Sequence, residues 1–563
     1  ETSDVFAEGY YVHTFHKLLP WQDNFKKHPE YYAFMNGKRI IDQLCLSNPD
    51  VLEKVISKLG EEMKRQPEKQ LWSVSQNDNF SYCQCDQCKK IIEEEGSPAG
   101  PLIRFVNKVA EAFPDKTIST LAYQYSRQAP LLTKPLDNVQ IMLCTIELNR
   151  SKPITKDPIG KQFVKDLEDW GKITNHIYLW DYTVNFSHSI SPFPNIHVLQ
   201  PNLKLFAEND VKEHFQQSNT GIAHEFSELK SYLLAKLLWN PELDVTSVIN
   251  EFADGYYGPA SPFIRKYIYS LKNNIQKSDE WLDIYGHPTA YQNTFLSAEN
   301  IALYNSYFDE AEKASSLLPE YLLHVKTARM SLQYAIMEIG KNDMFGERGW
   351  YKEENGEFVP RQEMIDMLEA FYKTSRDCNA SVINESGLSC EDYYHATKRF
   401  IDVQVKDNLA FRKTVSAKPL PSEKYSEGKL SYLTNGVKGA NDYKVHWLGW
   451  EGMNFSISLD LEKPSSAKEI QISTLWDPKS WILHPKAVSC SVSKDGFFFT
   501  KLGTLEVSGN QKNENVNHTF TFKAQGQEFR YVKFDIEGTQ KLYDWHPSAG
   551  GASWVFVDEI VVK

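Results

Sequence analysis

Between residues 9 and 228 the chain alternates short apolar runs with segments of helical periodicity. The run 139–147 is the clearest, because six of its first eight residues are apolar and β-branched or aliphatic types prevail. Such a run is typical of a parallel strand that is buried on both faces. Alternation of strands with helices predicts a parallel sheet, either doubly wound or closed as a barrel. The expected strands are 9–15, 71–78, 118–125, 139–147, 177–184 and 221–228.

Helical segments are expected at 48–65, 101–113 and 161–171, and Asn48-Pro49 is a start signal for the first of them. Six strand–helix units are two fewer than a (β/α)₈ barrel contains. The fold class expected is therefore α/β, a TIM-like barrel whose two N-terminal units are missing from this chain, which opens abruptly before its first strand.

The pattern changes twice further along the chain. Residues 229–410 are mainly helical in pattern, with apolar spacing at 231–239, 303–318 and 327–340. After a linker-like Ala417–Ser422, short alternating segments predict a β-sandwich. We expect three domains: a catalytic barrel at 1–230, a helical domain packed on it at 231–415, and a sandwich at 416–563. The sandwich strands are expected at 455–461, 469–476, 487–493, 519–524, 531–538 and 554–562.

Composition narrows the function classes only modestly. The net charge of −12 argues against a general affinity for nucleic acid. No stretch approaches the 18 or more apolar residues of a membrane-spanning helix, so no transmembrane segment is expected. Aromatic residues are plentiful at 13%, and their flat faces suit sugar rings and protein cores alike.

Each expected strand of the first region ends in polar residues. Active sites of parallel α/β folds, and of barrels above all, are built at the carboxyl ends of the strands. Glycoside cleavage needs a proton donor near the leaving oxygen and a group that stabilises positive charge at the anomeric carbon. Glu147 and Asp78 are the leading catalytic pair, because both end strongly apolar strands and have amide neighbours. Alternatively, either carboxylate has no catalytic role and only binds ligand or accepts hydrogen bonds that stabilise the fold.

Other polar and aromatic residues near the same strand ends are candidates for substrate binding. Trp180 and Tyr182 would offer aromatic platforms, while Asp181 and Glu225 suit substrate binding or a salt bridge better than proton transfer. His13 would either bind a sugar hydroxyl or be a satisfied core residue. The full set expected to bind substrate is His13, Gln76, Asn77, Tyr123, Asn149, Arg150, Trp180, Asp181, Tyr182 and Glu225.

Three cysteines lie close together at Cys83, Cys85 and Cys88. This spacing invites a metal site, but a structural zinc site usually has four ligands, and no second cysteine pair or paired histidine follows nearby. A disulfide or a packed, reduced cysteine turn is therefore favoured over a metal, and no metal ligand is assigned. No phosphate-binding glycine loop and no nucleophile elbow are present.

Several stretches together resemble a known bacterial family. They are VHTFHKLLP, HPEYYAFMNGKR, QLCLSNPDV, SVSQNDNFSYCQCDQC, CTIELNRS and LLWNPELDVTSVINEFADGYYGPA, in order over about residues 9–260. They resemble glycoside hydrolase family 163, formerly a domain of unknown function, whose members occur in polysaccharide-utilisation systems of gut Bacteroidetes. The resemblance implies a (β/α)₈ barrel with endo-β-N-acetylglucosaminidase activity, which cuts the chitobiose core of complex-type N-glycans.

The resemblance also implies a retaining, substrate-assisted mechanism, in which the 2-acetamido oxygen attacks the anomeric carbon. Such a mechanism needs one acid/base and one group that orients the acetamide. From the strand ends we assign Glu147 as acid/base and Asp78 as the acetamide-orienting group, with the exchanged roles left open. No cofactor is expected for catalysis.

The tail resembles the F5/8 type C, discoidin-like, sandwich through LTNGVKG (433–439), VSKDG (492–496), RYVKF (530–534) and WVFVDEIVV (554–562). Such modules often bind carbohydrate and often hold a calcium ion of structural role, so a structural calcium is allowed for here. The candidate sugar platforms, which could equally be core residues, are Trp447, Trp450, Trp481 and Trp545.

Together these patterns favour a bacterial glycosidase that is secreted, periplasmic or attached to the cell surface, with N-glycans and glycoproteins as partners. One alternative is an exo-acting hexosaminidase or glucuronidase on a related barrel, which would close its site where an endo enzyme keeps an open cleft. The other is a non-catalytic glycan-binding surface protein.

Overall fold

The computed structural model describes residues 5–218, 221–354, 357–398, 401, 408–439, 443, 446–507, 516–546 and 548–563. The chain divides into two compact units. The first is built from Glu1–Ile339 with Ala370–Cys390, and the second from Gly340–Glu369 with Glu391–Lys563.

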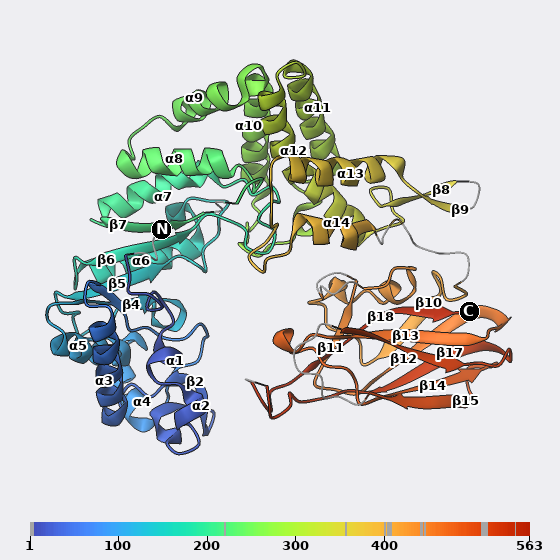
Figure 1. Ribbon diagram of the computed structural model, residues 1–563, viewed down its shortest axis with the longest axis horizontal. Coiled ribbons are helices and arrows are strands. Elements are labelled where there is room, and N and C mark those ends of the chain that lie inside the picture. Colours follow the sequence, from blue (N-terminus) through green and yellow to red (C-terminus); the bar gives the residue numbers. More distant parts are fainter. Residues whose placement is uncertain are drawn as a thin grey trace. The chain divides into compact units, whose positions relative to one another are not determined.

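The centre of the first unit is a curled sheet of five parallel strands, which we name the half-barrel (Figure 1). Its strands, in spatial order, are β3 (Leu71–Ser73), β4 (Thr117–Ala122), β5 (Val139–Cys144), β6 (Ile177–Tyr182) and β7 (Glu213–Gln217). The parallel α/β sheet and the strands expected at 118–125, 139–147 and 177–184 are thus confirmed, whereas only Leu71–Ser73 of the strand expected at 71–78 pairs in the sheet. The described residues form this open sheet, and the closed (β/α)₈ ring stays a prediction.

Helices pack against one face of the half-barrel. They are α3 (Pro49–Arg65), α5 (Ala99–Ala112), α6 (Pro158–Gly171), α7 (Ile196–Glu208) and α8 (Ser227–Trp239). In α3, Asn48 caps the first turn by accepting a 2.9 Å hydrogen bond from the Asp50 amide, and Pro49 occupies the position where a missing N–H costs nothing. Residues four apart on α3, from Val51 to Met63, are buried against the sheet. Each such side chain contributes about 1.5–3 kcal/mol.

The other face of the sheet is lined by a second set of alternating residues, among them Leu121, Met142 and Tyr178, which belong to a separate core. An N-terminal segment runs beside β3: Phe6 forms a parallel bridge with Leu71, and the Ser73 amide donates to the Tyr10 carbonyl at 3.0 Å. The segment then crosses the inner face, where the Tyr11 ring stacks on Trp180 at 5.5 Å and meets Phe215 of β7 at 6.2 Å.

Two of the expected strands are wrong. Residues 9–15 form turns, because His13 takes a left-handed conformation (φ 56°) and helix α1 (Phe15–Leu18) begins directly after Thr14. Residues 221–228 form turns that lead into α8, with Phe226 also left-handed. The fifth strand lies earlier, at β7, whose sequence EHFQQ is mostly polar. Its first residue, Glu213, accepts a 2.6 Å hydrogen bond from Gln140 of β5, so polar side chains pair inside the sheet and the apolar signal is absent.

A small subdomain precedes and follows β3. It contains α2 (Trp21–Asn24), the antiparallel hairpin of β1 (Tyr32–Met35) and β2 (Lys38–Leu44), and α4 (Asp86–Glu95). The hairpin turns at Asn36-Gly37, where both residues have positive φ (52° and 78°), the combination that a tight two-residue hairpin requires.

The expected helical region is present as α9 (Val245–Tyr257), α10 (Ser261–Ser278), α11 (Ala298–Ala314), α12 (Pro319–Asn342), α13 (Gln362–Asp377) and α14 (Cys390–Lys398). Helices α9, α10 and α11 pack in sequence and share the inner-face core of the first unit through Ile249, Tyr267 and Phe308. A short hairpin, β8 (Tyr351–Glu354) with β9 (Glu357–Pro360), belongs to the second unit. None of the helices in the described ranges is both long and apolar enough to cross a bilayer.

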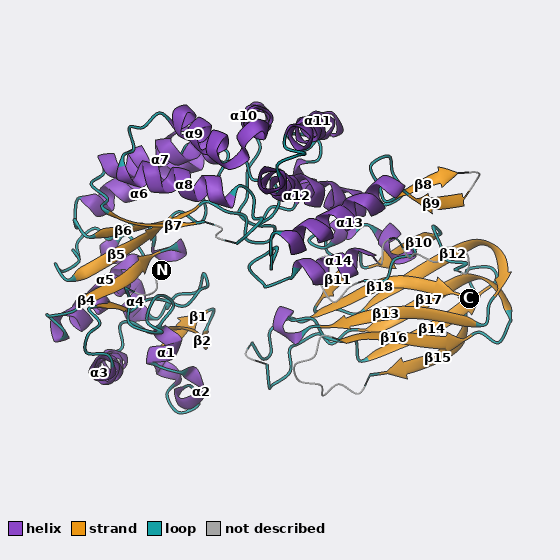
Figure 2. Cartoon of the chain, turned by 45° about the horizontal axis from the view of Figure 1, so that its top comes forward, coloured by secondary structure: helices purple, strands orange, loops and turns teal. Residues whose placement is uncertain are grey.

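The second unit contains two antiparallel sheets (Figure 2). One has the order β10 (Thr414–Lys418), β12 (Phe455–Ser466), β17 (Glu528–Glu537), β14 (Ala487–Ser493) and β15 (Thr500–Glu506); the other has β11 (Leu448–Glu451), β18 (Trp554–Val562), β13 (Glu469–Trp476) and β16 (Val516–Lys523). Ile457 and Phe534 of the first sheet share one core with Ile472 and Val557 of the second, so the sheets pack face to face. The six strands expected here are confirmed; β10, β11 and β15 were not expected.

The candidate sugar platforms of this unit differ in exposure. Trp447 and Trp450 are buried, and the latter stacks on Phe455 at 4.0 Å. Trp545 is half-buried beside Tyr543. Trp481 is 45% exposed, in a left-handed turn after Pro478-Lys479-Ser480, so its ring is the most exposed of the four.

Candidate active site

Asp78 lies in the segment that follows β3, and it is exposed. Its Oδ1 accepts a 2.9 Å hydrogen bond from the hydroxyl of Tyr123, the residue directly after β4. Burial, with the negative charge of Asp78, raises the pKa of Tyr123, so this phenol stays a donor. The His13 ring lies 5.9 Å from the Tyr123 ring. Three expected site residues, from the N-terminal segment and the ends of two strands, thus come together at what we name the carboxyl edge of the half-barrel.

Gln76 and Asn77, the two residues before Asp78, are held by hydrogen bonds to neighbouring segments. Gln76 is fully buried and donates to Ser126 Oγ at 2.7 Å. Gln43, at the end of β2, pairs with the peptide group of Asn77: its Oε1 accepts from the Asn77 amide at 3.0 Å, and its Nε2 donates to the Asn77 carbonyl at 2.8 Å. The structure therefore places Asn77 as a support of the Asp78 segment, whereas the Oε1 of Gln76 is buried without a hydrogen-bond partner.

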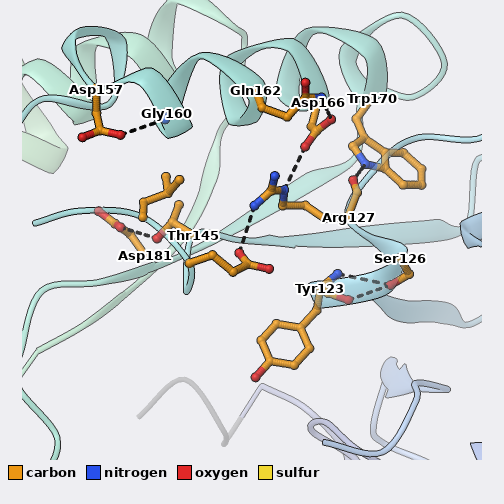
Figure 3. A network of polar contacts seen from close by, with 12 residues as sticks. Tyr123, Ser126, Arg127, Thr145, Asp157, Gly160, Gln162, Asp166, Trp170 and Asp181 are labelled. Carbon is orange, nitrogen blue, oxygen red and sulfur yellow. Dashed lines mark hydrogen bonds and ion pairs between the residues drawn. The ribbon is translucent and has the colours of Figure 1, made fainter. Parts of the chain in front are cut away.

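Glu147 follows β5 and forms an ion pair with Arg127, whose Nη1 lies 3.0 Å from Glu147 Oε2. The same guanidinium donates through Nε to Asp166 of α6 at 2.8 Å (Figure 3). The Glu147 side chain is 31% exposed, whereas that of Asp166 is 2% exposed. Burial alone would lower the pKa of Arg127, but the attraction of the two carboxylates outweighs it and the pKa is raised.

Cys144, at the end of β5, and Tyr182, at the end of β6, belong to the core on the inner face of the sheet. Burial raises the pKa of the Cys144 thiol, and the negative charges of both Glu147 and Asp78 act on it in the same direction. Burial likewise raises the pKa of Tyr182, with contributions from Cys144 and Tyr123. Asp78 follows β3 and Glu147 follows β5 of the same parallel sheet, so both carboxylates lie at the carboxyl edge. Trp180, half-buried, stacks on Tyr182 at 5.6 Å, and we name these two rings the floor of the candidate site.

Two expected substrate-binding residues are internal braces. Arg150 is buried and donates to the carbonyl oxygens of Tyr182 (2.5 Å) and Thr145 (2.7 Å), and burial lowers its pKa. Asp181 is buried and accepts from the Thr145 hydroxyl at 2.6 Å (Figure 3). Their hydrogen bonds join the loop after β5 to the end of β6, so they fix the backbone that carries Glu147.

Asn149 is a third brace: its Oδ1 accepts from the amides of Ser151 (2.8 Å) and Leu282 (3.0 Å). Glu225 is buried at the start of α8, in an ion pair with Lys230 at 2.5 Å. Burial raises the pKa of Glu225 although Lys230 opposes the shift. Glu225 also borders a cavity of about 180 Å³ with mainly apolar walls from α7, α9 and α10, which is a gap between helices and shares no other residue with the carboxyl edge.

The sequence interpretation missed Arg127, Asp166 and Tyr285. Tyr285 is 49% exposed, and its ring packs on Phe186 at 5.6 Å. Burial raises its pKa, and Asp78 is among the negative charges that add to the shift. Arg127 had a weak sequence signal, since it follows β4 closely, but Asp166 lies mid-helix and Tyr285 lies far along the chain in a segment interpreted as helical.

Residues 1–269 match the model of a family described as "Domain of unknown function (DUF4838)". No curated protein matches the chain.

Solved structures that match part of the chain include a CBM32 module of the GH89 protein of Clostridium perfringens, at 18% identity over 28% of this chain and 98% of that one, with a TM-score of 0.18. A fucose-binding module of Streptococcus pneumoniae has 13% identity over 28% and 93% of the two chains, with a TM-score of 0.20. The C-terminal domain of a chitobiase from Bacteroides fragilis has 14% identity over 27% and 94%, with a TM-score of 0.18.

Proposed function

We propose that this protein is a glycoside hydrolase, an endo-β-N-acetylglucosaminidase that cuts the chitobiose core of complex-type N-glycans with retention of configuration. The observation that carries the proposal is the pair of carboxylates at the carboxyl edge, Asp78 bonded to Tyr123 and Glu147 bonded to Arg127, over a floor of Tyr182 and Trp180. The choice of N-glycans, and of an endo cut, rests on the resemblance of the sequence motifs to family 163.

The reaction would proceed in two steps. First, the carbonyl oxygen of the substrate's own 2-acetamido group attacks the anomeric carbon, while an acid protonates the departing glycosidic oxygen. The ring closed in this way carries positive charge that an adjacent carboxylate stabilises through the acetamide N–H. Water then attacks the anomeric carbon, loses its proton to the same acid/base, and re-forms the acetamide. Two inversions at one carbon give retention.

Asp78 and Tyr123 suit the acetamide. The exposed carboxylate would accept the acetamide N–H, and the Tyr123 hydroxyl, now bonded to Asp78, would be close enough to donate to the acetamide oxygen. Pre-ordered donors and acceptors of this kind stabilise charge without reorganisation in the transition state.

Glu147 would then be the acid/base. Arg127 holds its carboxylate in place, and the braces formed by Arg150 and Asp181 fix the loop beneath it. The exchanged assignment, with Asp78 as acid/base, uses the same geometry and is separated from this one by experiment.

The test is mass spectrometry of a glycoprotein bearing complex biantennary N-glycans after incubation with the protein. We expect a single GlcNAc to remain on asparagine, and Glu147→Gln and Asp78→Asn each to lower the rate by about 10²–10⁴-fold, the usual size of acid–base and charge-stabilising contributions. Glu68→Gln and Asp115→Asn, exposed acids on the same unit but outside the site, are the matched controls.

The two roles are separated with a substrate whose leaving group needs no protonation, an activated aryl glycoside. Such a substrate should rescue the variant of the acid/base but not the variant of the acetamide-orienting group. Release of terminal sugars alone would favour the exo-acting alternative. Binding without cleavage, unaffected by either substitution, would overturn the enzyme assignment in favour of glycan capture.

A further inference from the structure

Four cysteines gather in the small subdomain beside β3. Cys45 directly follows β2, Cys83 and Cys85 precede α4, and Cys88 lies in the first turn of that helix. Their four sulfur atoms all lie within 4.8 Å of one another. Cys45, Cys83 and Cys88 are buried and Cys85 is half-buried. The sequence had shown only three neighbouring cysteines, and folding of the hairpin supplies the fourth from upstream.

The spacing of the sulfur atoms differs from that of a disulfide. The Sγ atoms of Cys45 and Cys85 are 3.7 Å apart, whereas a disulfide bond is about 2.05 Å long. With zinc–sulfur bonds of about 2.3 Å, the edge of a tetrahedron of four sulfurs is about 3.8 Å. All eight cysteines of the chain are free in the structure. The geometry is therefore that of sulfurs around a shared centre.

The surroundings of the cluster favour thiolates. Cys85 and Cys88 form a C-x₂-C pair on the N-terminus of α4, where the helix dipole and free amides stabilise negative charge. The backbone amide of Phe34 donates to Cys83 Sγ at 3.3 Å, and Arg39 Nη1 lies 3.9 Å from the same sulfur. Four thiolates on a divalent ion leave an excess of negative charge, and these two hairpin donors are placed to offset part of it.

We propose that Cys45, Cys83, Cys85 and Cys88 bind one zinc ion. Four sulfur ligands fill a tetrahedral site and leave no open position, so the role is structural rather than catalytic. A soft, four-sulfur donor set excludes the hard cations that prefer oxygen. This site goes beyond the proposed glycosidase activity and does not depend on it.

The ion would join three pieces of chain that also meet through hydrogen bonds and apolar packing: the β1–β2 hairpin, the segment after Asp78, and α4. Just before Cys45, the carbonyl of Asp42 accepts from the side-chain amides of Asn77 (2.8 Å) and Asn79 (3.2 Å). The zinc thus secures the hairpin that supports the Asp78 segment, from a position away from the carboxyl edge.

The first experiment is elemental analysis of the full chain, produced with zinc in the medium and freed of loosely bound metal by gel filtration. We expect about one zinc per chain, as four sulfur ligands to one ion require. Cys45→Ser and Cys88→Ser should each lose most of it, while Cys378→Ser, a half-buried cysteine outside the cluster, should retain it. Zinc far below one per chain in the wild-type protein overturns the proposal, and so does retention of full zinc by both cluster variants.

A second experiment uses the wild-type protein alone, because the cluster variants can fail to fold. Alkylation after denaturation with a chelator, without reductant, should modify all eight cysteines, whereas a disulfide in the cluster would leave at least two unmodified. X-ray absorption at the zinc edge should show only sulfur at about 2.3 Å. A disulfide, oxygen or nitrogen ligands, or iron in place of zinc would each overturn the assignment.

Discussion

Arg127 lies with its Nη1 3.0 Å from the Oε2 of Glu147, and it makes this contact with a guanidinium that is already anchored to buried Asp166. The anchoring matters because an exposed ion pair on its own does not fix the position of a carboxylate. A guanidinium that is itself held by a second, buried carboxylate does fix the position of its partner. The indole of Trp170 adds a third restraint, by donating to the Arg127 carbonyl at 2.7 Å (Figure 3).

Replacing Arg127 by lysine should therefore harm catalysis more than binding. Lysine keeps the charge but cannot donate in two fixed directions. We expect kcat on the glycopeptide to fall by about 10–100-fold, as expected of lost positioning, with KM little changed. The steady-state measurement is read beside the Tm of the same variant, with Arg104→Lys, which pairs with Glu94 and Glu95 outside the site, as the matched control. An equal fall in both variants would contradict a positioning role.

Tyr123→Phe removes the hydroxyl and keeps the packing of the ring, so it tests the contribution of the hydroxyl alone. The ring is buried but its hydroxyl meets exposed Asp78, so the free energy of unfolding should change by only about 1 kcal/mol. If the hydroxyl orients the acetamide, kcat should fall by about 10–100-fold, as for a donor made in the transition state. The check is kinetics on the glycopeptide together with urea unfolding. Unchanged kcat would remove Tyr123 from the mechanism.

Acidic residues in the second unit predict a pH dependence of stability. Asp558 is fully buried on β18 and burial raises its pKa to about 7; burial also raises that of neighbouring Glu559. A carboxyl whose folded pKa exceeds its unfolded value stabilises the fold at low pH, and this contribution is lost as pH rises from about 4 through 7. For Asp558 the loss is on the order of 4 kcal/mol.

The measurement is the free energy of unfolding of the second unit, obtained by chemical denaturation at a series of pH values from 4 to 8. Asp558→Asn should be less pH-dependent than the wild type, because an amide keeps the shape without the ionisation. The exposed Asp535→Asn on β17 is the control and should leave the slope unchanged. A wild-type stability that rises over this range, or an Asp558→Asn variant with the wild-type slope, would refute the prediction.

Trp481 is where sugar binding by the second unit can be tested. Trp481→Ala should weaken retention on immobilised glycans while leaving Tm within about 2 °C, since exposed side chains contribute little to stability. The matched change at buried Trp447 should instead destabilise the unit by about 3–5 kcal/mol. Retention that is the same for Trp481→Ala and wild type would place sugar binding elsewhere.

The sequence predicted the elements best where one physical pattern dominates. The strands Glu469–Trp476 and Trp554–Val562 were predicted to the residue, because apolar side chains alternate or run continuously along them. β7 was not predicted because it is mostly polar: Glu213 accepts a hydrogen bond from Gln140, and Gln217 accepts one from the indole of Trp180 at 2.8 Å. A local pattern cannot show such a partner.

The residues of the candidate site were likewise predicted where a local pattern marks them and missed where a distant partner decides their role. Strand ends led to Asp78, Tyr123 and Glu147, because the parallel topology alone brings these ends to one edge. Whether a polar residue there faces a ligand or braces the backbone depends on its partners, so Asn77 and Arg150 were interpreted as binding residues although they are supports. Arg127 and Cys45 are partners themselves, and only the folded chain brings them to Glu147 and to the other cysteines.

The inner face of the half-barrel is bridged by rings rather than by a further strand. In the described chain β7 pairs only with β6, and Tyr11 reaches Phe215 and Trp180 across the opening. The contacts of Tyr11 with these two rings can separate without the loss of a backbone hydrogen bond. Opening the sheet at this place therefore costs less free energy than opening it between the central strands. Amide hydrogens of β7 should therefore exchange with deuterated solvent well before those of β5, and a ligand that wedges against Trp180 should slow that exchange.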